Sequence, residues 1–389
     1  MSKPSSPLPL EGMRVLDFAQ FLAGPAAAMR LADLGADVVK IERPQGGDLC
    51  RSLAINEQYL DGSSLLFQTF NRNKRSVAAD LKVEADLAAV KQLVATADVM
   101  IHNFRPGVME RIGLDYDSVA KINPCIVYGW VTGYGTSGPW RDKPGQDLLV
   151  QSMSGLAWLQ GNRDDPPIPA GLPILDSATA LNLTQGILAA LLRRTTTGRG
   201  GLVEADLLST AIDLQFEPMT AYFNDRGDNR PSRSEIANAN LYGAAPYGIY
   251  ATADGYLAIA MTPLARLSEL LGCPEIGTFD QSEAFACRNE IKPVVAKVLA
   301  SKTTAEWLAV LEPADIWCAR VMNWQELAES DGFQALDPLQ TVTTESGEQA
   351  VTTRCPFRLD GRTLTSTRGA PRLGAHTSEI LDAISPAST

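Results

Sequence analysis

The 389-residue sequence has only two histidines, His102 and His376. A lone histidine is more often structural than catalytic, and no Ser-His-Asp arrangement can be assembled around either one. The six cysteines are scattered, with no C-x-x-C pair, so neither a zinc site nor a disulfide framework is indicated. We therefore expect no metal, and cysteines that are small buried side chains in a reducing compartment.

The sequence also lacks an excess of basic residues, since its formal net charge is −11. A nucleic-acid-binding protein needs a basic surface, so nucleic acid is not an expected partner. The longest apolar runs, such as Ile187–Leu192, are too short to cross a membrane. The first seven residues lack the apolar core of a signal peptide. We expect a cytoplasmic protein that does not associate with a membrane.

A third absence concerns the turn after the first predicted strand. The segment Phe18–Pro25 has no G-x-G-x-x-G pattern, so a nicotinamide-dinucleotide enzyme loses its main support from the sequence. The helix that follows could still present its N-terminus to an anionic group, or the segment could be a plain structural turn.

What is present is an alternation of short apolar segments with helical ones. Strands are predicted at Arg14–Phe18, Asp37–Ile41, Val99–His102, Cys125–Val131 and Leu202–Leu207, and helices at Ala26–Leu34, Glu84–Ala97 and Ala178–Arg194. Alternation of this kind is typical of an α/β fold in which crossover helices cover parallel strands.

The pattern changes near Asn224, where the polar segment Asn224–Pro231 predicts a loop or linker. Gly248–Met261 reads as a hairpin with a turn at Asp254-Gly255, and Glu290–Ala300 and Thr304–Leu311 read as helices. A chain of this length is expected to form two domains, and we assign the second, smaller α+β domain to this middle region.

Basic residues cluster near the ends of several predicted strands. In an open α/β sheet, ligands bind outside the carboxyl ends of the strands, and arginine grips phosphate bidentately. The alternative is ordinary solvated surface charge, and only the repetition of the clusters favours a ligand with several phosphates. The clusters comprise Lys40 and Arg43; Arg72, Lys74 and Arg75; and Arg105 and Arg111.

Asp176 lies at the start of the strong helix predicted at Ala178–Arg194. The helix dipole stabilises a carboxylate at this place. From the residues alone, the commoner role for such an aspartate is that of an N-cap.

Together, these segments resemble the class III CoA-transferases, also called the CaiB/BaiF family, which include formyl-CoA transferase, carnitine CoA-transferase and α-methylacyl-CoA racemase. The resemblance extends over nearly the whole chain, and the order and spacing of its motifs carry it. The motifs are Leu10–Phe18, Ala23–Pro25, Leu34–Arg43, Asn71–Ser76, Asn103–Gly107, Gly133–Pro139, the Asp176 segment, Thr197–Gly200 and Leu373–Thr377.

The resemblance implies an interlocked homodimer. A large Rossmann-like domain would be built from both chain ends, residues 1–224 and 331–389, with a small domain at 225–330. The large domain would hold coenzyme A or its acyl ester as substrate, with the active site at the dimer interface. Carried over by position, the CoA-binding residues are Arg43, Lys74, Arg75, Asn103, Phe104, Arg111 and Lys143.

By the same resemblance, Asp176 is the catalytic aspartate of an acyl-CoA:carboxylate CoA-transferase. It would form a mixed anhydride with the acyl group and then an aspartyl-CoA thioester, which divides one difficult exchange into easier steps. The other substrates would be small carboxylic acids.

The sequence departs from two members of the family. Asn238–Ala245 stands in the region of the glycine-rich loop of formyl-CoA transferase, and Leu22 and Leu53 replace a glutamine and a tryptophan of its oxalate site. These changes argue against formyl-CoA:oxalate specificity. Gln146, the second candidate catalytic residue, stands where the racemase has its catalytic histidine, and an amide cannot exchange a proton with a substrate carbon.

Two alternatives stay open at this point. One is an acyl-CoA racemase or epimerase, which Gln146 argues against. The other is a non-catalytic acyl-CoA-binding protein, which the presence of Asp176 and of the basic residues argues against. The sequence does not identify the donor acid or the acceptor acid.

Overall fold

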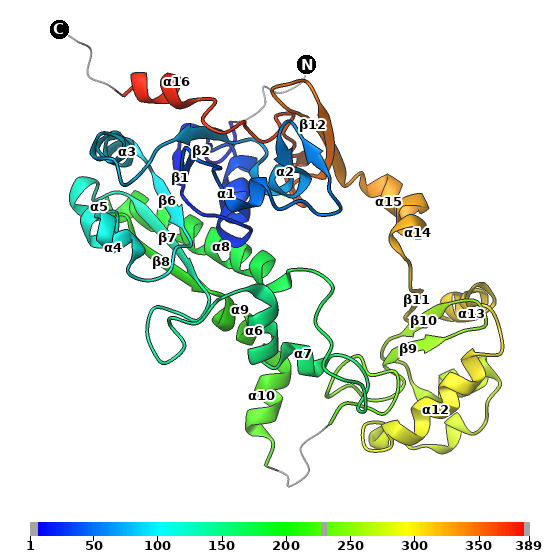
Figure 1. Cartoon of the computed structure of the whole chain (residues 1–389). Helices are drawn as coiled ribbons and strands as arrows, with labels where there is room; N and C mark the ends of the chain where they lie inside the picture. The colour runs from blue at the N-terminus through cyan, green and yellow to red at the C-terminus, as the bar shows by residue number, and fades with distance from the viewer. Residues whose placement is uncertain (1–6, 227–231, 385–389) are drawn as a thin grey trace. The chain divides into compact units, whose positions relative to one another are not determined.

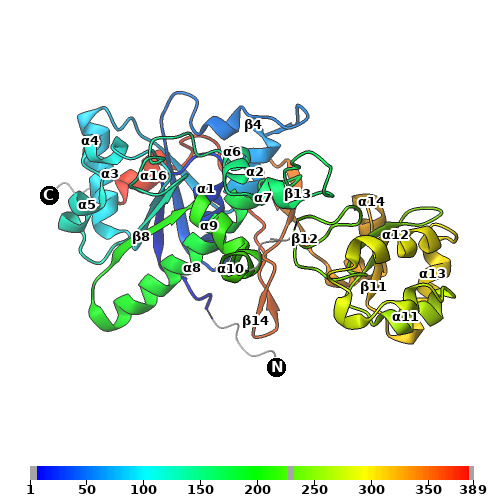
Figure 2. The ribbon, with the colours of Figure 1, turned by 90° about the horizontal axis from the view of Figure 1, so that it is seen from below.

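The computed structural model describes residues 7–226 and 232–384 (Figures 1 and 2). The predicted loop Asn224–Pro231 falls partly on residues 227–231, outside the described residues. The chain forms two compact units. Among the described residues, the first unit comprises 7–150, 173–210 and 337–384, and the second comprises 151–172 and 211–336 with its gap at 227–231. Segments from both ends of the chain thus belong to the first unit.

A six-stranded parallel sheet forms the centre of the first unit. Its strand order is β5-β2-β1-β6-β7-β8, and every neighbouring pair is parallel. The strands are β1 (Arg14–Asp17), β2 (Asp37–Glu42), β5 (Arg75–Ala78), β6 (Val99–His102), β7 (Val127–Thr132) and β8 (Gly201–Asp206). The prediction of an α/β fold with a parallel sheet is confirmed, and five of these strands were expected; β5 was not.

Helices α1 (Ala23–Asp33) and α8 (Ile174–Thr197) pack on one face of this sheet and against each other. Gly129 of β7 makes the close approach of α8 feasible, because a Cβ there would lie 3.1 Å from Ile187 and 3.3 Å from Leu183. Alternate side chains of the strands, such as Leu16 and Met100, point to the other face and join a second core. The helices of that core, grouped in Figures 1 and 2, are α3 (Glu84–Thr96), α4 (Val108–Ile112), α5 (Tyr116–Ile122) and α16 (Thr377–Asp382).

Among the described residues, α8 is the one helix that is long and apolar enough to cross a membrane by length and composition. Its contacts with α1, β7 and β8 give a simpler reason for that composition, because a helix in a core needs an apolar face. Leu175, Leu183 and Ile187 are fully buried in these contacts.

Short elements complete the first unit. They are η1 (Leu49–Arg51), α2 (Leu65–Asn71) and three two-stranded sheets, β3 (Tyr59–Leu60) with β4 (Ser63–Ser64), β12 (Leu339–Thr343) with β13 (Gln349–Thr353), and β14 (Arg358–Leu359) with β15 (Arg362–Thr363). The C-terminal segment returns to the sheet, since the backbone N–H of His376 donates to the carbonyl of Ser76 in β5.

The second unit contains an antiparallel sheet in the order β11-β10-β9. Its strands are β9 (Gly248–Ala251), β10 (Tyr256–Ile259) and β11 (Cys318–Arg320). The predicted hairpin is confirmed, and Thr252 N–H donates to Gly255 O across its turn. The other elements are α7 (Leu156–Leu159), α10 (Phe216–Asn224), α11 (Leu264–Leu271), η2 (Ile276–Thr278), η3 (Gln281–Glu283), α12 (Arg288–Leu299), α13 (Thr304–Leu311), η4 (Glu312–Ala314), α14 (Trp324–Glu329) and α15 (Asp331–Leu336); α6 (Asp147–Met153) and α9 (Leu207–Leu214) include the residues where one unit gives way to the other.

Candidate active site

A pocket of about 230 Å³ opens at the carboxyl edge of the parallel sheet. Residues that end or follow β1, β2 and β5 line it, together with residues that follow β6. This is the edge at which open α/β sheets bind ligands. The lining comprises Phe18–Gln20, Lys40–Arg43, Gly47, Asp48, Ala79–Lys82, Phe104, Val108 and Ile112.

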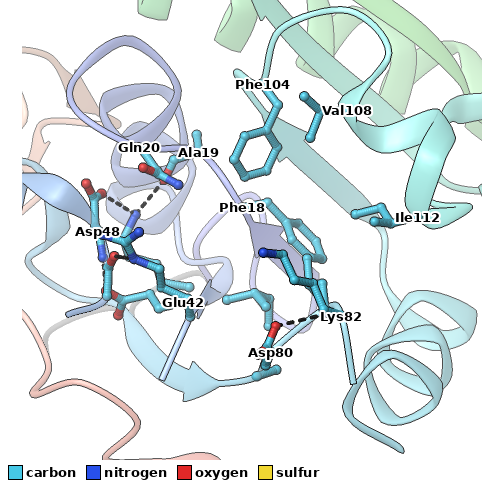
Figure 3. A pocket seen from close by; sticks show the side chains of 16 residues that line it. Phe18, Ala19, Gln20, Glu42, Asp48, Asp80, Lys82, Phe104, Val108 and Ile112 are labelled. Atoms are coloured by element: carbon cyan, nitrogen blue, oxygen red, sulfur yellow. Dashed lines mark hydrogen bonds and ion pairs between the residues drawn. The ribbon is translucent and has the colours of Figure 1, made fainter. Parts of the chain in front are cut away.

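The two sides of the pocket differ in chemistry. Figure 3 shows Phe18, Phe104, Val108 and Ile112 gathered on one side, and polar groups including Gln20 on the other. An aromatic and aliphatic wall of this kind can pack against a flat ring. The pocket therefore combines an apolar surface with hydrogen-bonding groups.

Three of the predicted CoA-binding residues, Arg43, Asn103 and Phe104, meet at this pocket. Arg43 is exposed, and its Nε donates to Gly47 O at 3.0 Å. Asn103 braces the turn after β1, because its Oδ1 accepts from Gln20 N–H at 2.8 Å and its Nδ2 donates to Gln20 O at 2.7 Å. Arg43 and Phe104 line the pocket directly, and Asn103 holds one of its walls.

A buried ion network supports the same turn. Lys40 Nζ donates to Ala19 O at 2.7 Å and lies 2.9 Å from Asp48 Oδ2 and 3.7 Å from Asp17 Oδ2. Burial alone would lower the pKa of Lys40, but Asp17, Asp48 and Glu42 outweigh burial and raise the pKa to about 12. Lys40 is therefore a charged internal brace.

Lys82 is a pocket residue that the sequence analysis missed. It is exposed, lines the pocket and follows β5, with its backbone N–H donated to Asp80 Oδ1 at 3.0 Å. Figure 3 shows Lys82 near the apolar wall. Recognising the short strand β5 in the sequence would have predicted Lys82 at the carboxyl edge of the sheet.

Arg111 and Lys143 lie outside the lining of this pocket. Arg111 is exposed on α4, the helix that contributes Val108 and Ile112 to the apolar wall. Lys143 is exposed in the loop between β7 and α6. Arg111 is thus adjacent to the pocket, and Lys143 belongs to a different loop.

Lys74 and Arg75 do not join the pocket residues. Lys74 is fully buried, and its Nζ donates to Asp17 Oδ2 at 2.7 Å, Pro25 O at 2.8 Å and Asn71 Oδ1 at 2.9 Å. An ammonium has three protons, so none is left for a phosphate.

Arg75 is the first residue of β5, at the amino edge of the sheet, where its guanidinium pairs with Asp37 and Glu379. This basic cluster was expected near the end of a strand, whereas it immediately precedes β5 and includes its first residue. The structure therefore separates Lys74 and Arg75 from the other predicted CoA-binding residues.

Asp176 is the third residue of α8 and is half-buried. The residue at the N-cap position is Pro173, and the cap is supplied from elsewhere: Asp147 Oδ2 accepts from Leu175 N–H at 2.8 Å and from Asp176 N–H at 2.9 Å. The reading of Asp176 as an N-cap is therefore wrong. Its carboxylate accepts no hydrogen bond from the residues that the structure describes.

The pKa of Asp176 is raised from its ordinary value of 3.8 to about 7. The main cause is burial of the carboxyl group, and the second is the negative charge of Asp147. Near neutral pH, a large fraction of this carboxyl group is ionised, and as a carboxylate it has free oxygen lone pairs. Such a group can act as a nucleophile.

Gln146, the other candidate catalytic residue, directly precedes Asp147 and is exposed. Its backbone carbonyl accepts from Leu149 N–H at 3.0 Å and Val150 N–H at 3.1 Å at the start of α6. The bond from Asp147 to the backbone of Asp176 brings these two segments together. Gln146 and Asp176 thus belong to one region of the first unit.

Among the residues that the structure describes, no contact joins either histidine to that region. Burial lowers the pKa of His102 to about 3, and its ring stacks on Phe104 and Trp130 with Nδ1 accepting from Phe104 N–H. His376 Nδ1 accepts from Ser76 N–H. Both side chains therefore have structural contacts. Over residues 7–226 and 232–384, no group of three or more His, Cys, Asp or Glu side chains is placed to hold a metal ion.

Comparison with known proteins identifies one family over nearly the whole chain. Residues 10–377 match the model of CoA-transferase family III. The chain is 32% identical to succinate–glutarate CoA-transferase of Agrobacterium fabrum, with 97% of this chain and 96% of the relative covered. It is also 32% identical to formyl-CoA:oxalate CoA-transferase of Streptomyces avermitilis, with 95% and 94% covered.

Among solved structures, a CaiB/BaiF family protein from Brucella suis matches 97% of this chain and 100% of its own, with a TM-score of 0.83 and 30% identity. A family match from residue 10 to residue 377, together with this structural match, leaves no large part of the chain unassigned. The chain belongs to CoA-transferase family III, the CaiB/BaiF family, and is an enzyme of the CoA-transferase class.

Proposed function

We propose that this chain is an acyl-CoA:carboxylate CoA-transferase in which Asp176 is the covalent acyl carrier. The observation that carries the proposal is the state of the Asp176 carboxylate. It is half-buried at the start of α8, has no hydrogen bond from the described residues, and is not needed as a helix cap. A free carboxylate in such a place is suited to attack on a carbonyl carbon.

The proposed reaction begins when a carboxylate oxygen of Asp176 attacks the thioester carbonyl of the acyl-CoA. The C–S bond breaks, CoA leaves as a thiolate, and a mixed anhydride remains. The thiolate then attacks the aspartyl carbonyl of the anhydride and releases the donor acid, which leaves an aspartyl-CoA thioester. The acceptor carboxylate attacks this thioester to give a second anhydride and CoA thiolate. Attack of the thiolate on the acceptor carbonyl yields the new acyl-CoA and restores Asp176.

We assign the nucleotide part of CoA to the pocket at the carboxyl edge of the sheet. Arg43 and Lys82 are exposed cations there, and Phe104 offers an apolar wall for a flat ring. Asn103 acts by holding the turn after β1. Arg111 extends this set along α4, and Lys143 is assigned to CoA by family position alone. Lys74 and Arg75 are left out of the proposed site because other side chains already hold them.

The racemase alternative is disfavoured by Gln146. A racemase removes the α-proton from one face and returns a proton to the other, so it needs two proton-transfer groups. Gln146 is an amide and His102 is a buried, neutral imidazole held by stacking, so neither side chain supplies the second proton-transfer group. The non-catalytic alternative leaves unexplained a half-buried carboxylate of raised pKa that accepts no hydrogen bond from the described residues.

A screen of acyl-CoA donors against a panel of acids tests the function, with the CoA esters resolved by mass. The names of two relatives suggest that the first panel contain succinate, glutarate, oxalate and formate. We expect CoA to pass to an added acid, with no exchange of the α-hydrogen of a 2-methylacyl-CoA in deuterated water. Rapid deuterium incorporation without transfer to any acid would reverse the assignment.

We further propose that the protein works in the cytoplasm as an interlocked homodimer, with no nucleic-acid or membrane partner. Segments near both ends of the described chain belong to the first unit, and two segments from its middle form the second, which is compatible with threaded chains. Interlocked chains cannot separate without extensive unfolding, so the dimer should survive dilution. Sedimentation at nanomolar concentration tests this, and a folded monomer would contradict it.

A further inference from the structure

Asp147 caps the start of the helix that carries Asp176, a contact that no sequence motif predicted. The first N–H groups of an α-helix have no partner within the helix and are usually capped by the residue just before it. That residue is Pro173 here, and it makes no side-chain cap. Asp147, from the first position of α6, accepts from the N–H groups of both Leu175 and Asp176 instead.

The same arrangement leaves the Asp176 side chain without a local partner. An acidic side chain at the third helical position commonly folds back to bond the N-cap backbone N–H. Pro173 has no N–H, so this return bond cannot form. The N–H groups of Leu175 and Asp176 already donate to Asp147. The Asp176 carboxylate therefore accepts a hydrogen bond from neither of them.

We propose that Asp147 is a positioning residue for the transfer reaction: its carboxylate fixes the start of α8 and holds a negative charge beside Asp176. This inference rests on the proposed function of Asp176 as acyl carrier. The backbone bonds orient Asp176, and the charge makes its carboxylate a stronger base and hence a stronger nucleophile once it is ionised.

Among the residues that the structure describes, no other charged group shifts the pKa of Asp176 as Asp147 does. Helix α8 packs against α1, β7 and β8. The charged residues of these elements, with α6 added, are Arg30, Asp33, Asp147, Glu204 and Asp206. Among them, Asp147 alone alters the pKa of Asp176, with burial as the larger cause. Neutralising Asp147 should therefore move the titration of Asp176 down in pH.

The test uses the free enzyme and needs no CoA chemistry. A water-soluble carbodiimide with a nucleophilic amine modifies protonated carboxyl groups, and peptide mass spectrometry measures the modified fraction of Asp176 from pH 5 to pH 9. The wild-type midpoint is expected at about 7. Asp147→Asn keeps an oxygen that accepts the two N–H bonds but removes the charge, so its midpoint should be lower by about one pH unit.

Two further variants make the outcome decisive. Asp147→Ser also retains a neutral acceptor oxygen and should lower the midpoint in the same direction, which covers a failure of Asp147→Asn to fold. Glu204→Gln removes a negative charge from β8, an element that also packs against α8, and should leave the midpoint unchanged. A merely structural Asp147 predicts lower thermal stability of the Asp147 variants with an unmoved midpoint, and that result would overturn the proposal.

The pH profile of kcat/KM for transfer provides the second readout. Its acidic limb should move with the carbodiimide midpoint in Asp147→Asn and stay in place in Glu204→Gln. The two proposals fail differently. If wild-type Asp176 never becomes acylated, the proposed function fails; if it becomes acylated and the midpoint of neither Asp147 variant moves, only the role of Asp147 fails.

Discussion

Gly133 and Gly145 cross backbone to backbone, and a Cβ added to either would overlap the Cα of the other. Gly133 follows β7 and Gly145 precedes Gln146 and α6. The crossing therefore closes the loop between them, which the bond from Tyr134 OH to Pro144 O also spans at 3.3 Å. It determines where α6 begins, and so where the capping carboxylate of Asp147 lies relative to α8.

We predict that Gly145→Ala abolishes most transfer activity while CoA still binds. The added methyl group forces the two segments apart, at a cost of about 1–3 kcal/mol in stability, and moves Asp147 from the start of α8. Gly332→Ala is the control, since a Cβ there would meet no atom within 4 Å beyond its chain neighbours and its own helix backbone, and it should behave as wild type. Calorimetry with free CoA and a transfer assay measure the two effects; full activity in Gly145→Ala would contradict this account of the crossing.

CoA binding should depend on the carboxyl edge of the sheet and not on the amino edge. Arg43→Ala and Lys82→Ala each remove an exposed cation of the pocket. Loss of a charge-assisted contact costs roughly 1.5–3 kcal/mol, or about one to two decades in affinity. Arg75→Ala removes an arginine that pairs with Asp37 and Glu379 and should reduce stability without changing the Kd for CoA. Titration calorimetry giving one affinity for all three variants would reject the pocket.

Replacement of Lys40 by Met should destabilise the protein strongly. Lys40 is fully buried between Asp17 and Asp48, and removing one partner of a buried pair costs about 3–5 kcal/mol because a charge is left uncompensated. Since the pKa of Lys40 is raised to about 12, its contribution to stability is complete below about pH 10 and is lost as pH rises through 12. Urea unfolding at pH 7 measures the loss, and Lys82→Met, an exposed lysine, should show almost none.

The stability of the wild type relative to Asp176→Asn should fall as pH rises from 4 to 8. The folded protein binds a proton at Asp176 more tightly than the unfolded chain does, because the pKa is raised from 3.8 to about 7. Unfolding therefore becomes easier over this interval in the wild type alone. We expect the variant to be more stable at pH 8 by on the order of 1–2 kcal/mol, a value reduced for the partial exposure of the side chain. Urea midpoints at pH 4, 6 and 8 give the comparison, and a pH-independent difference would show that Asp176 titrates normally.

The parallel sheet could be predicted from the sequence because most of its strands are apolar and the helices that connect them are long. Strand β5 was missed since only Val77 is strongly apolar in Arg75–Ala78, too little for a periodic signal. Without β5, Lys74 and Arg75 could not be recognised as lying at the start of a strand, and Lys82 could not be recognised as following one. A charge pattern identifies a binding edge only when each strand before it is recognised.

The family resemblance named some residues of the candidate site, but the sequence could not predict how those residues are arranged. Asp176 could be named from the resemblance, but the residues alone favoured an N-cap, because a cap is usually local. The actual cap, Asp147, precedes Asp176 by 29 residues, and no local rule connects them. Tertiary structure was needed to show which of the two carboxylates is bonded and which is free.

The most direct test of the central claim is to trap the acyl-enzyme. The wild-type enzyme is incubated with the CoA ester that is most active in the donor screen, treated with hydroxylamine, digested and analysed by mass spectrometry. Hydroxylamine cleaves both the anhydride and the thioester, so the account predicts a hydroxamate at Asp176, absent from enzyme that received no CoA ester. Robust transfer of CoA by an enzyme whose Asp176 stays unmodified, or by Asp176→Ala, would contradict it.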